Sequence, residues 1–95
     1  MQKIIYKYEL NPYHALTELS IPIGAKVLCV QTDGKTDCPC IWALVDKDEE
    51  YLEERVFWII PTGVPFNGER TEYIGTFQMG EGHFVGHVFE KVNKY

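Results

Sequence analysis

The sequence has few of the residues that form helices and few that attract nucleic acid. Alanine, the best helix former, occurs three times in 95 residues, which disfavours helix along most of the chain. Arginine occurs only twice, and 14 acidic against 9 basic side chains give a formal net charge of −5. A surface of that sign repels phosphate backbones, so we expect no binding to long DNA or RNA, although a small phosphorylated ligand is still compatible with one arginine and backbone amides.

Long apolar runs and paired cysteines are lacking as well. Apolar runs such as residues 56–60 are far shorter than the roughly 20 residues of a membrane-spanning helix. Charged residues soon after Met1 argue against a signal peptide. Because the three cysteines are an odd number, we expect free thiols and a cytoplasmic location rather than a disulfide framework.

Residues that favour strands are abundant. Valine, isoleucine, threonine and the aromatic residues make up 35 of the 95 residues. Alternating apolar and polar residues, separated by glycine, proline, asparagine and aspartate, predict seven strands: residues 3–10, 16–23, 26–32, 40–45, 55–60, 70–79 and 83–89. The strand 40–45 is apolar on both faces and is predicted to be central, whereas Pro22 marks an edge strand, and the acidic residues 46–54 are expected in a loop.

This pattern predicts an all-β protein with a single domain over residues 1–95, a small antiparallel sandwich or barrel of about seven strands.

Catalytic and metal-binding patterns are weak. Cys38 and Cys40 share one side of an extended chain, but no second cysteine pair completes a zinc site. His83 and His87 lie roughly 13 Å apart on a strand, at about 3.3 Å per residue, so they cannot chelate one ion. The only serine, Ser20, is within a predicted strand. We therefore expect no metal and no cofactor, and we consider an enzyme less favoured than a binding protein.

Thirteen aromatic side chains exceed what the core of such a small domain encloses. Their flat faces suit a base, another ligand or a second subunit, so a homo-oligomer is expected. For a small anion, Arg55 is the predicted cationic fork, Thr62 and Gly63 offer a hydroxyl and a backbone amide, and Trp42 or Trp58 offers a stacking face. In the alternative interpretation, Arg55 forms a surface ion pair with Glu53, Glu54 or Asp46.

Several motifs resemble those of a family of short uncharacterised bacteriophage and bacterial proteins. They are Tyr-Lys-Tyr-Glu-Leu from residue 6, Pro-Cys-Ile-Trp-Ala-Leu-Val-Asp from residue 39, Thr-Gly from residue 62, Tyr-Ile-Gly-Thr-Phe-Gln from residue 73 and His-Val-Phe-Glu from residue 87. The resemblance carries no established activity. It favours the polar and aromatic residues inside the pattern as shared functional positions: Trp42, Thr62, Gly63, Tyr73, Thr76, Gln78 and His87.

Three functions remain open from the sequence. The first is a non-enzymatic phage-type binding protein, a counter-defence protein that sequesters a nucleotide signalling molecule at a subunit interface. The second is an inhibitor or interaction module that binds a host protein through an aromatic face. The third is a small enzyme whose site the sequence does not reveal.

Overall fold

The computed structural model describes residues 2–92, which form seven strands and no helix. In chain order the strands are β1 (Lys3–Glu9), β2 (Leu16–Pro22), β3 (Lys26–Thr32), β4 (Pro39–Asp46), β5 (Leu52–Pro61), β6 (Thr71–Met79) and β7 (Phe84–Lys91). The predicted all-β fold is thus confirmed. Within residues 2–92 there is no helix that could span a membrane.

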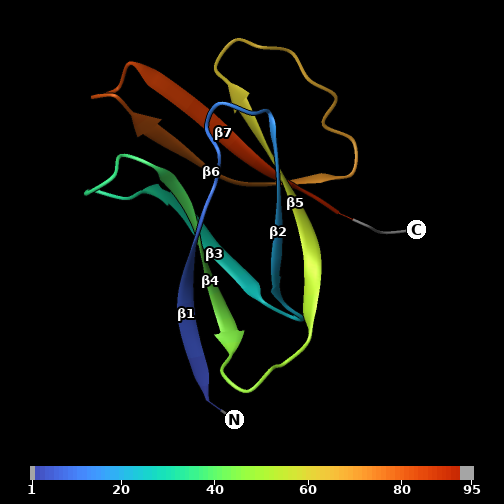
Figure 1. Ribbon diagram of the computed structural model, residues 1–95. Coiled ribbons are helices and arrows are strands. Elements are labelled where there is room, and N and C mark those ends of the chain that lie inside the picture. Colours follow the sequence, from blue (N-terminus) through green and yellow to red (C-terminus); the bar gives the residue numbers. More distant parts are fainter. Residues whose placement is uncertain (1, 93–95) are drawn as a thin grey trace.

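The strands form two antiparallel sheets that pack face to face as a sandwich (Figure 1). One sheet has three strands in the order β1-β4-β3, and the other has four in the order β2-β5-β7-β6. The predicted central position of the strand that carries Trp42 is confirmed, because β4 lies between β1 and β3. The predicted edge position of the strand that carries Pro22 is confirmed for β2.

One boundary differs clearly from the expectation. Residues 52–54 were expected in an acidic loop but belong to β5, where they pair with the last residues of β2. Their backbone hydrogen bonds to β2 hold them in the ladder, and Glu53 and Glu54 still reach solvent at the edge of the sandwich. Strand β5 is the longest strand because its first half pairs with β2 and its second half with β7.

The core lies between the sheets. It combines Phe57, Ile59, Phe77 and Val88 of the four-stranded sheet with Val30 and Ile41 of the three-stranded sheet, and all of these side chains are buried. Successive residues of a strand point to opposite faces. The residues between these core positions therefore form an outer face on the four-stranded sheet, which carries Trp58, Ile60, Tyr73, Thr76, Gln78, His87 and Phe89.

Gly86 permits close packing within the four-stranded sheet. A Cβ atom at this buried position would lie 2.6 Å from Cζ and 2.8 Å from Cε1 of the buried Phe77 ring. We therefore expect Gly86→Ala to lower the free energy of unfolding by about 1–3 kcal/mol, the usual cost of overpacking, as measured by urea titration. Gly34→Ala is the matched control, because a Cβ atom there meets nothing within 4 Å. Equal stability of the two variants would contradict this role of Gly86.

Candidate functional site

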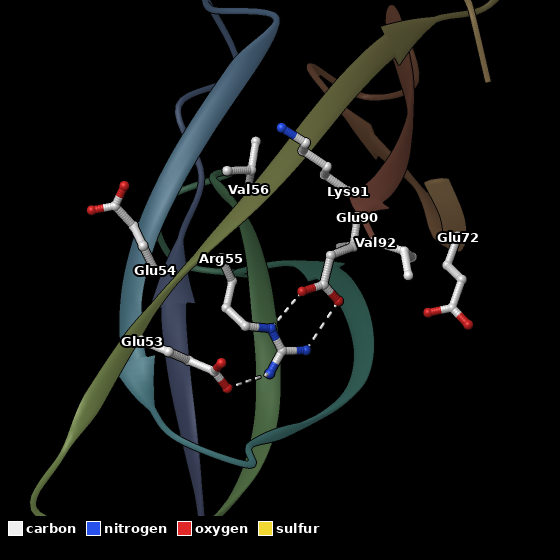
Figure 2. A pocket seen from close by; sticks show the side chains of 8 residues that line it. All are labelled: Glu53, Glu54, Arg55, Val56, Glu72, Glu90, Lys91 and Val92. Carbon is white, nitrogen blue, oxygen red and sulfur yellow. Dashed lines mark hydrogen bonds and ion pairs between the residues drawn. The ribbon is translucent and has the colours of Figure 1, made fainter. Parts of the chain in front are cut away.

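Two hollows lie on the four-stranded sheet, and the first is a notch where β7 departs from β5 (Figure 2). Strand β5 pairs with β7 only from Phe57 onward, so the preceding residues of β5 leave an opening beside the end of β7. The notch has a volume of about 300 Å³ and is lined by Glu53, Glu54, Arg55, Val56, Glu72, Glu90, Lys91 and Val92. We call it the acidic notch.

Arg55 is held inside the acidic notch by Glu90. Its Nε and Nη2 atoms donate to the two carboxylate oxygens of Glu90 at 2.5 and 3.0 Å, and Nη1 donates to the carbonyl oxygen of Ala25 at 2.7 Å. The side chains of Arg55 and Glu90 are only 18% and 10% exposed. The hydrogen bond to Glu90 raises the pKa of Arg55 above its ordinary value. The pair thus ties β5 and β7 to the turn that precedes β3.

These contacts do not favour the anion-binding role predicted for Arg55, because its fork is already occupied. The notch also carries four carboxylates against two cations, Arg55 and Lys91, so its field repels an anion. The alternative interpretation, a surface ion pair, holds in part. Glu53 Oε2 lies 3.8 Å from Arg55 Nη1, but the main partner is Glu90 and the pair is largely enclosed.

Four of the predicted site residues form one chain of hydrogen bonds on the outer face. His87 Nε2 lies 2.8 Å from Thr62 Oγ1, and His87 Nδ1 lies 2.9 Å from Thr76 Oγ1. Thr76 Oγ1 in turn lies 2.6 Å from the hydroxyl of Tyr73. The register of the sheet explains this proximity, since Thr76 and His87 are directly opposed on β6 and β7.

The chain of hydrogen bonds orders polar groups but is poorly suited to nucleophilic catalysis. A neutral imidazole donates with one nitrogen and accepts with the other. Each group in the series therefore donates to the next one, either in the direction from Thr62 to Tyr73 or in the opposite direction. A threonine beside a histidine base has the form of an activated nucleophile. However, the group that orients His87 is the Thr76 hydroxyl, which stabilises an imidazolium far less than a carboxylate does. The arrangement therefore fits recognition of a polar group better than acyl transfer.

The second hollow lies on the outer face, beneath the loop that joins β5 to β6. Figure 1 shows this loop swinging away from the end of β5 before it returns to the start of β6. The hollow has a volume of about 510 Å³ and is lined by Trp58, Ile60, Phe66, Asn67, Glu69, Arg70, Thr71 and Lys91. We call it the aromatic hollow.

Aromatic contacts fix the floor and one wall of the aromatic hollow. Trp58 and Ile60 project from the outer face of β5, and Phe66 of the loop packs on Phe89 with ring centroids 4.8 Å apart. Phe89 also contacts Tyr73, at 5.4 Å between centroids. The hollow and the hydrogen-bonded chain adjoin, because Ile60 and His87 are opposed residues of β5 and β7.

The lining of the aromatic hollow includes two cationic side chains and one carboxylate. Arg70 lies in the loop and Lys91 at the end of β7, with Glu69 nearby. Among residues 2–92, the ion pairs involve Lys7 and Arg55 as cations, and neither Arg70 nor Lys91. The hollow thus combines flat apolar surface with positive charge not used in those pairs, in contrast to the acidic notch.

Most of the predicted site residues gather on one side of the molecule. Seven of the nine lie on the outer face or in its adjoining turn: Trp58, Thr62, Gly63, Tyr73, Thr76, Gln78 and His87. Gly63 adopts a φ of +85° in the turn after β5, a conformation that favours glycine. Arg55 lies instead in the acidic notch, and Trp42 lies on the other sheet, with Lys7 Nζ 5.8 Å from the centroid of its ring.

Of the eight residues that line the aromatic hollow, the sequence identifies only Trp58 as a site residue, and it does not identify the partner of Arg55. The sequence predicts a turn at Phe66, the start of the strand 70–79 at Arg70, and a position after the last strand for Lys91. Glu90, which binds Arg55, was not identified as a site residue. An aromatic residue and an arginine within one proline- and glycine-rich loop were the only signal for the hollow.

The cysteines are free thiols in shielded positions. Cys40 is fully buried, and burial raises its pKa to about 11. Burial also raises the pKa of Cys38. Among residues 2–92, no three histidine, cysteine, aspartate or glutamate residues lie close enough together to hold a metal ion.

Since the thiolate is the reactive form, we expect iodoacetamide near neutral pH to modify Cys40 at least about tenfold more slowly in the folded protein than in urea. Peptide mass spectrometry over a time course measures this ratio. Equal rates in the two states would show that Cys40 is accessible in solution, contrary to the structure.

Comparisons with known proteins give a family but no activity. No curated protein and no solved structure matches the chain. A match over residues 1–95 is found to the family described as "Domain of unknown function (DUF7352)", in agreement with the resemblance to an uncharacterised family. The chain therefore belongs to the DUF7352 family.

Proposed function

We propose that the protein is a non-enzymatic binding protein that holds a small aromatic anion, of the nucleotide class, in the aromatic hollow. The observation that carries this proposal is the position of Arg70 and Lys91 beside the apolar surface of Trp58 and Phe66. A volume of about 510 Å³ falls within the range of about 300–1,000 Å³ that is usual for small-molecule sites.

The base and the phosphate of a nucleotide each have matching groups in the hollow. The aromatic faces of Trp58 and Phe66 suit a base, and stacking of this kind contributes about 1–3 kcal/mol per base. The guanidinium of Arg70 suits two phosphate oxygens at once, and Lys91 adds a second positive charge. Asn67 accepts a hydrogen bond from the backbone of Glu69 through Oδ1, which leaves its amide donors for a ligand.

Sequestration of a nucleotide signal requires affinity without turnover. The aromatic hollow supplies stacking surface, positive charge and hydrogen-bond donors, which are the groups that affinity needs. The resemblance of several motifs to those of phage and bacterial proteins is compatible with such a role, and a counter-defence use is part of this proposal.

Isothermal titration calorimetry tests the proposal with adenosine and guanosine monophosphates. Adenosine, guanosine and inorganic phosphate are the controls, since each presents only the base or only the charge. We expect a monophosphate to bind at least about tenfold more tightly than its nucleoside or phosphate, because both parts of the hollow are then occupied. Absence of binding by every nucleotide to folded protein would overturn the proposal and favour the alternative, an interaction module for another protein. Equally tight binding of inorganic phosphate would also overturn it.

A further inference from the structure

Strand β1 presents a free edge on the side away from β4. It pairs with β4 over seven residues, and no strand among residues 2–92 pairs with its other edge. The side chains of Ile5 and Tyr6 on this strand are 55% and 45% exposed. An edge of this length, with apolar side chains, is a template for strand pairing.

The other edge strands are less favourable for pairing than β1. Strand β2 ends at Pro22, which has no backbone donor. Strands β3 and β6 lie against each other, because Thr32 Oγ1 donates to the carbonyl oxygen of Gln78 at 2.6 Å. A lysine that is free on an edge strand disfavours pairing with another strand. On β1, however, Lys7 is held over its own sheet by an ion pair with Asp33 and by the ring of Trp42.

The geometry of antiparallel pairing restricts how β1 can meet β1 of a second copy. Directly opposed residues share a face of the sheet. A two-fold axis therefore passes midway between the two copies of one residue, and residues at equal distances before and after that residue oppose each other. For a seven-residue strand, an axis at the central residue, Tyr6, opposes every residue of one strand with a residue of the other.

The charges of β1 favour the same axis. With the axis at Tyr6, Lys3 of each copy opposes Glu9 of the other, and this attractive pair occurs twice. With the axis at Ile5, Lys3 opposes Lys7, and with the axis at Lys7, the two Lys7 residues oppose each other. Both of these shifted registers place like charges opposite one another, which is destabilising.

We propose that two copies of this chain pair antiparallel through β1, with a two-fold axis at Tyr6, to give one continuous six-stranded sheet. The aromatic hollow lies on the other sheet and is complete within one copy, so this assembly does not depend on the proposed ligand. The proposed ligand site therefore lies within one subunit, whereas the sequence favours a ligand site at a subunit interface.

Sedimentation velocity over a range of concentrations measures the assembly. Seven opposed residue pairs make a small interface, so we expect dissociation in the range of about 1–100 µM. The wild-type protein should approach twice its chain mass of 11.0 kDa at the highest concentrations. A mass of 11.0 kDa for the wild type throughout the range would overturn the proposal.

Charge reversal tests the register. Lys3→Glu and Glu9→Lys each give like charges at both opposed positions, so each variant alone should dimerise at least about tenfold more weakly than the wild type. A mixture of the two variants opposes unlike charges again and should form heterodimers of wild-type affinity. The double variant Lys3→Glu/Glu9→Lys should also dimerise normally.

Lys26→Glu, an exposed reversal on β3, is the control and should leave dimerisation unchanged. Wild-type dimerisation of both single variants, or failure of the mixture to associate, would overturn the register centred on Tyr6. Neither result would affect nucleotide binding, so the two proposals fail separately.

Discussion

Arg55→Met is expected to lower the free energy of unfolding by about 2–4 kcal/mol, because it leaves the carboxylate of Glu90 without its partner. Removal of one member of a buried ion pair usually costs about 3–5 kcal/mol, and the slight exposure of these two side chains shifts the expected loss below that range by about 1 kcal/mol. Urea titration followed by tryptophan fluorescence measures the change.

The double variant Arg55→Met/Glu90→Met is the informative control. It removes both charges and fills the space with apolar atoms of similar length, a replacement that is often neutral. We therefore expect it to recover most of the stability lost by the single variant. A loss of no more than about 1 kcal/mol for Arg55→Met would instead indicate an exposed, weak ion pair and would contradict the enclosed geometry.

Arg70→Gln is expected to weaken binding of a nucleoside monophosphate by about tenfold to a hundredfold. Loss of a hydrogen bond between charged groups costs about 1.5–3 kcal/mol, which corresponds to this range. Glutamine keeps most of the side-chain length but lacks the charge and the planar fork. Arg70→Lys keeps the charge alone and should give an intermediate loss. Calorimetry with the same nucleotide measures both variants.

Lys47→Gln is the matched control for Arg70→Gln, since Lys47 is exposed and lies outside both hollows. It should bind the nucleotide as the wild type does. Equal affinity of the Arg70 and Lys47 variants would show that Arg70 does not contact the phosphate, even if the protein binds nucleotides elsewhere.

Local sequence was sufficient to predict the strands. Alternation and turn residues placed all seven, and the two-sided apolar pattern around Trp42 identified the central strand β4. The start of β5 was missed because residues 52–54 owe their extended form to β2, which lies far away in the sequence. Acidic composition alone did not indicate that pairing.

The candidate site was less predictable because it depends on contacts between distant segments. Arg55 and Glu90 are 35 residues apart, and their contact follows from the register of β5 and β7. Thr62, Thr76 and His87 were identified individually, but only the sheet places them in one hydrogen-bonded chain. The aromatic hollow likewise joins a loop to the ends of two strands, which no single segment of the sequence describes.

The most direct test of the account uses the two tryptophans of the protein, which lie on different sheets. Trp58 lines the aromatic hollow, whereas Trp42 lies on the three-stranded sheet and serves as an internal control. A nuclear magnetic resonance titration with adenosine or guanosine monophosphate follows both indole N–H signals, assigned with a Trp42→Phe variant. We predict that nucleotide shifts the Trp58 signal and leaves the Trp42 signal in place. An unchanged Trp58 signal at millimolar nucleotide, or a shift of Trp42 alone, would contradict the account.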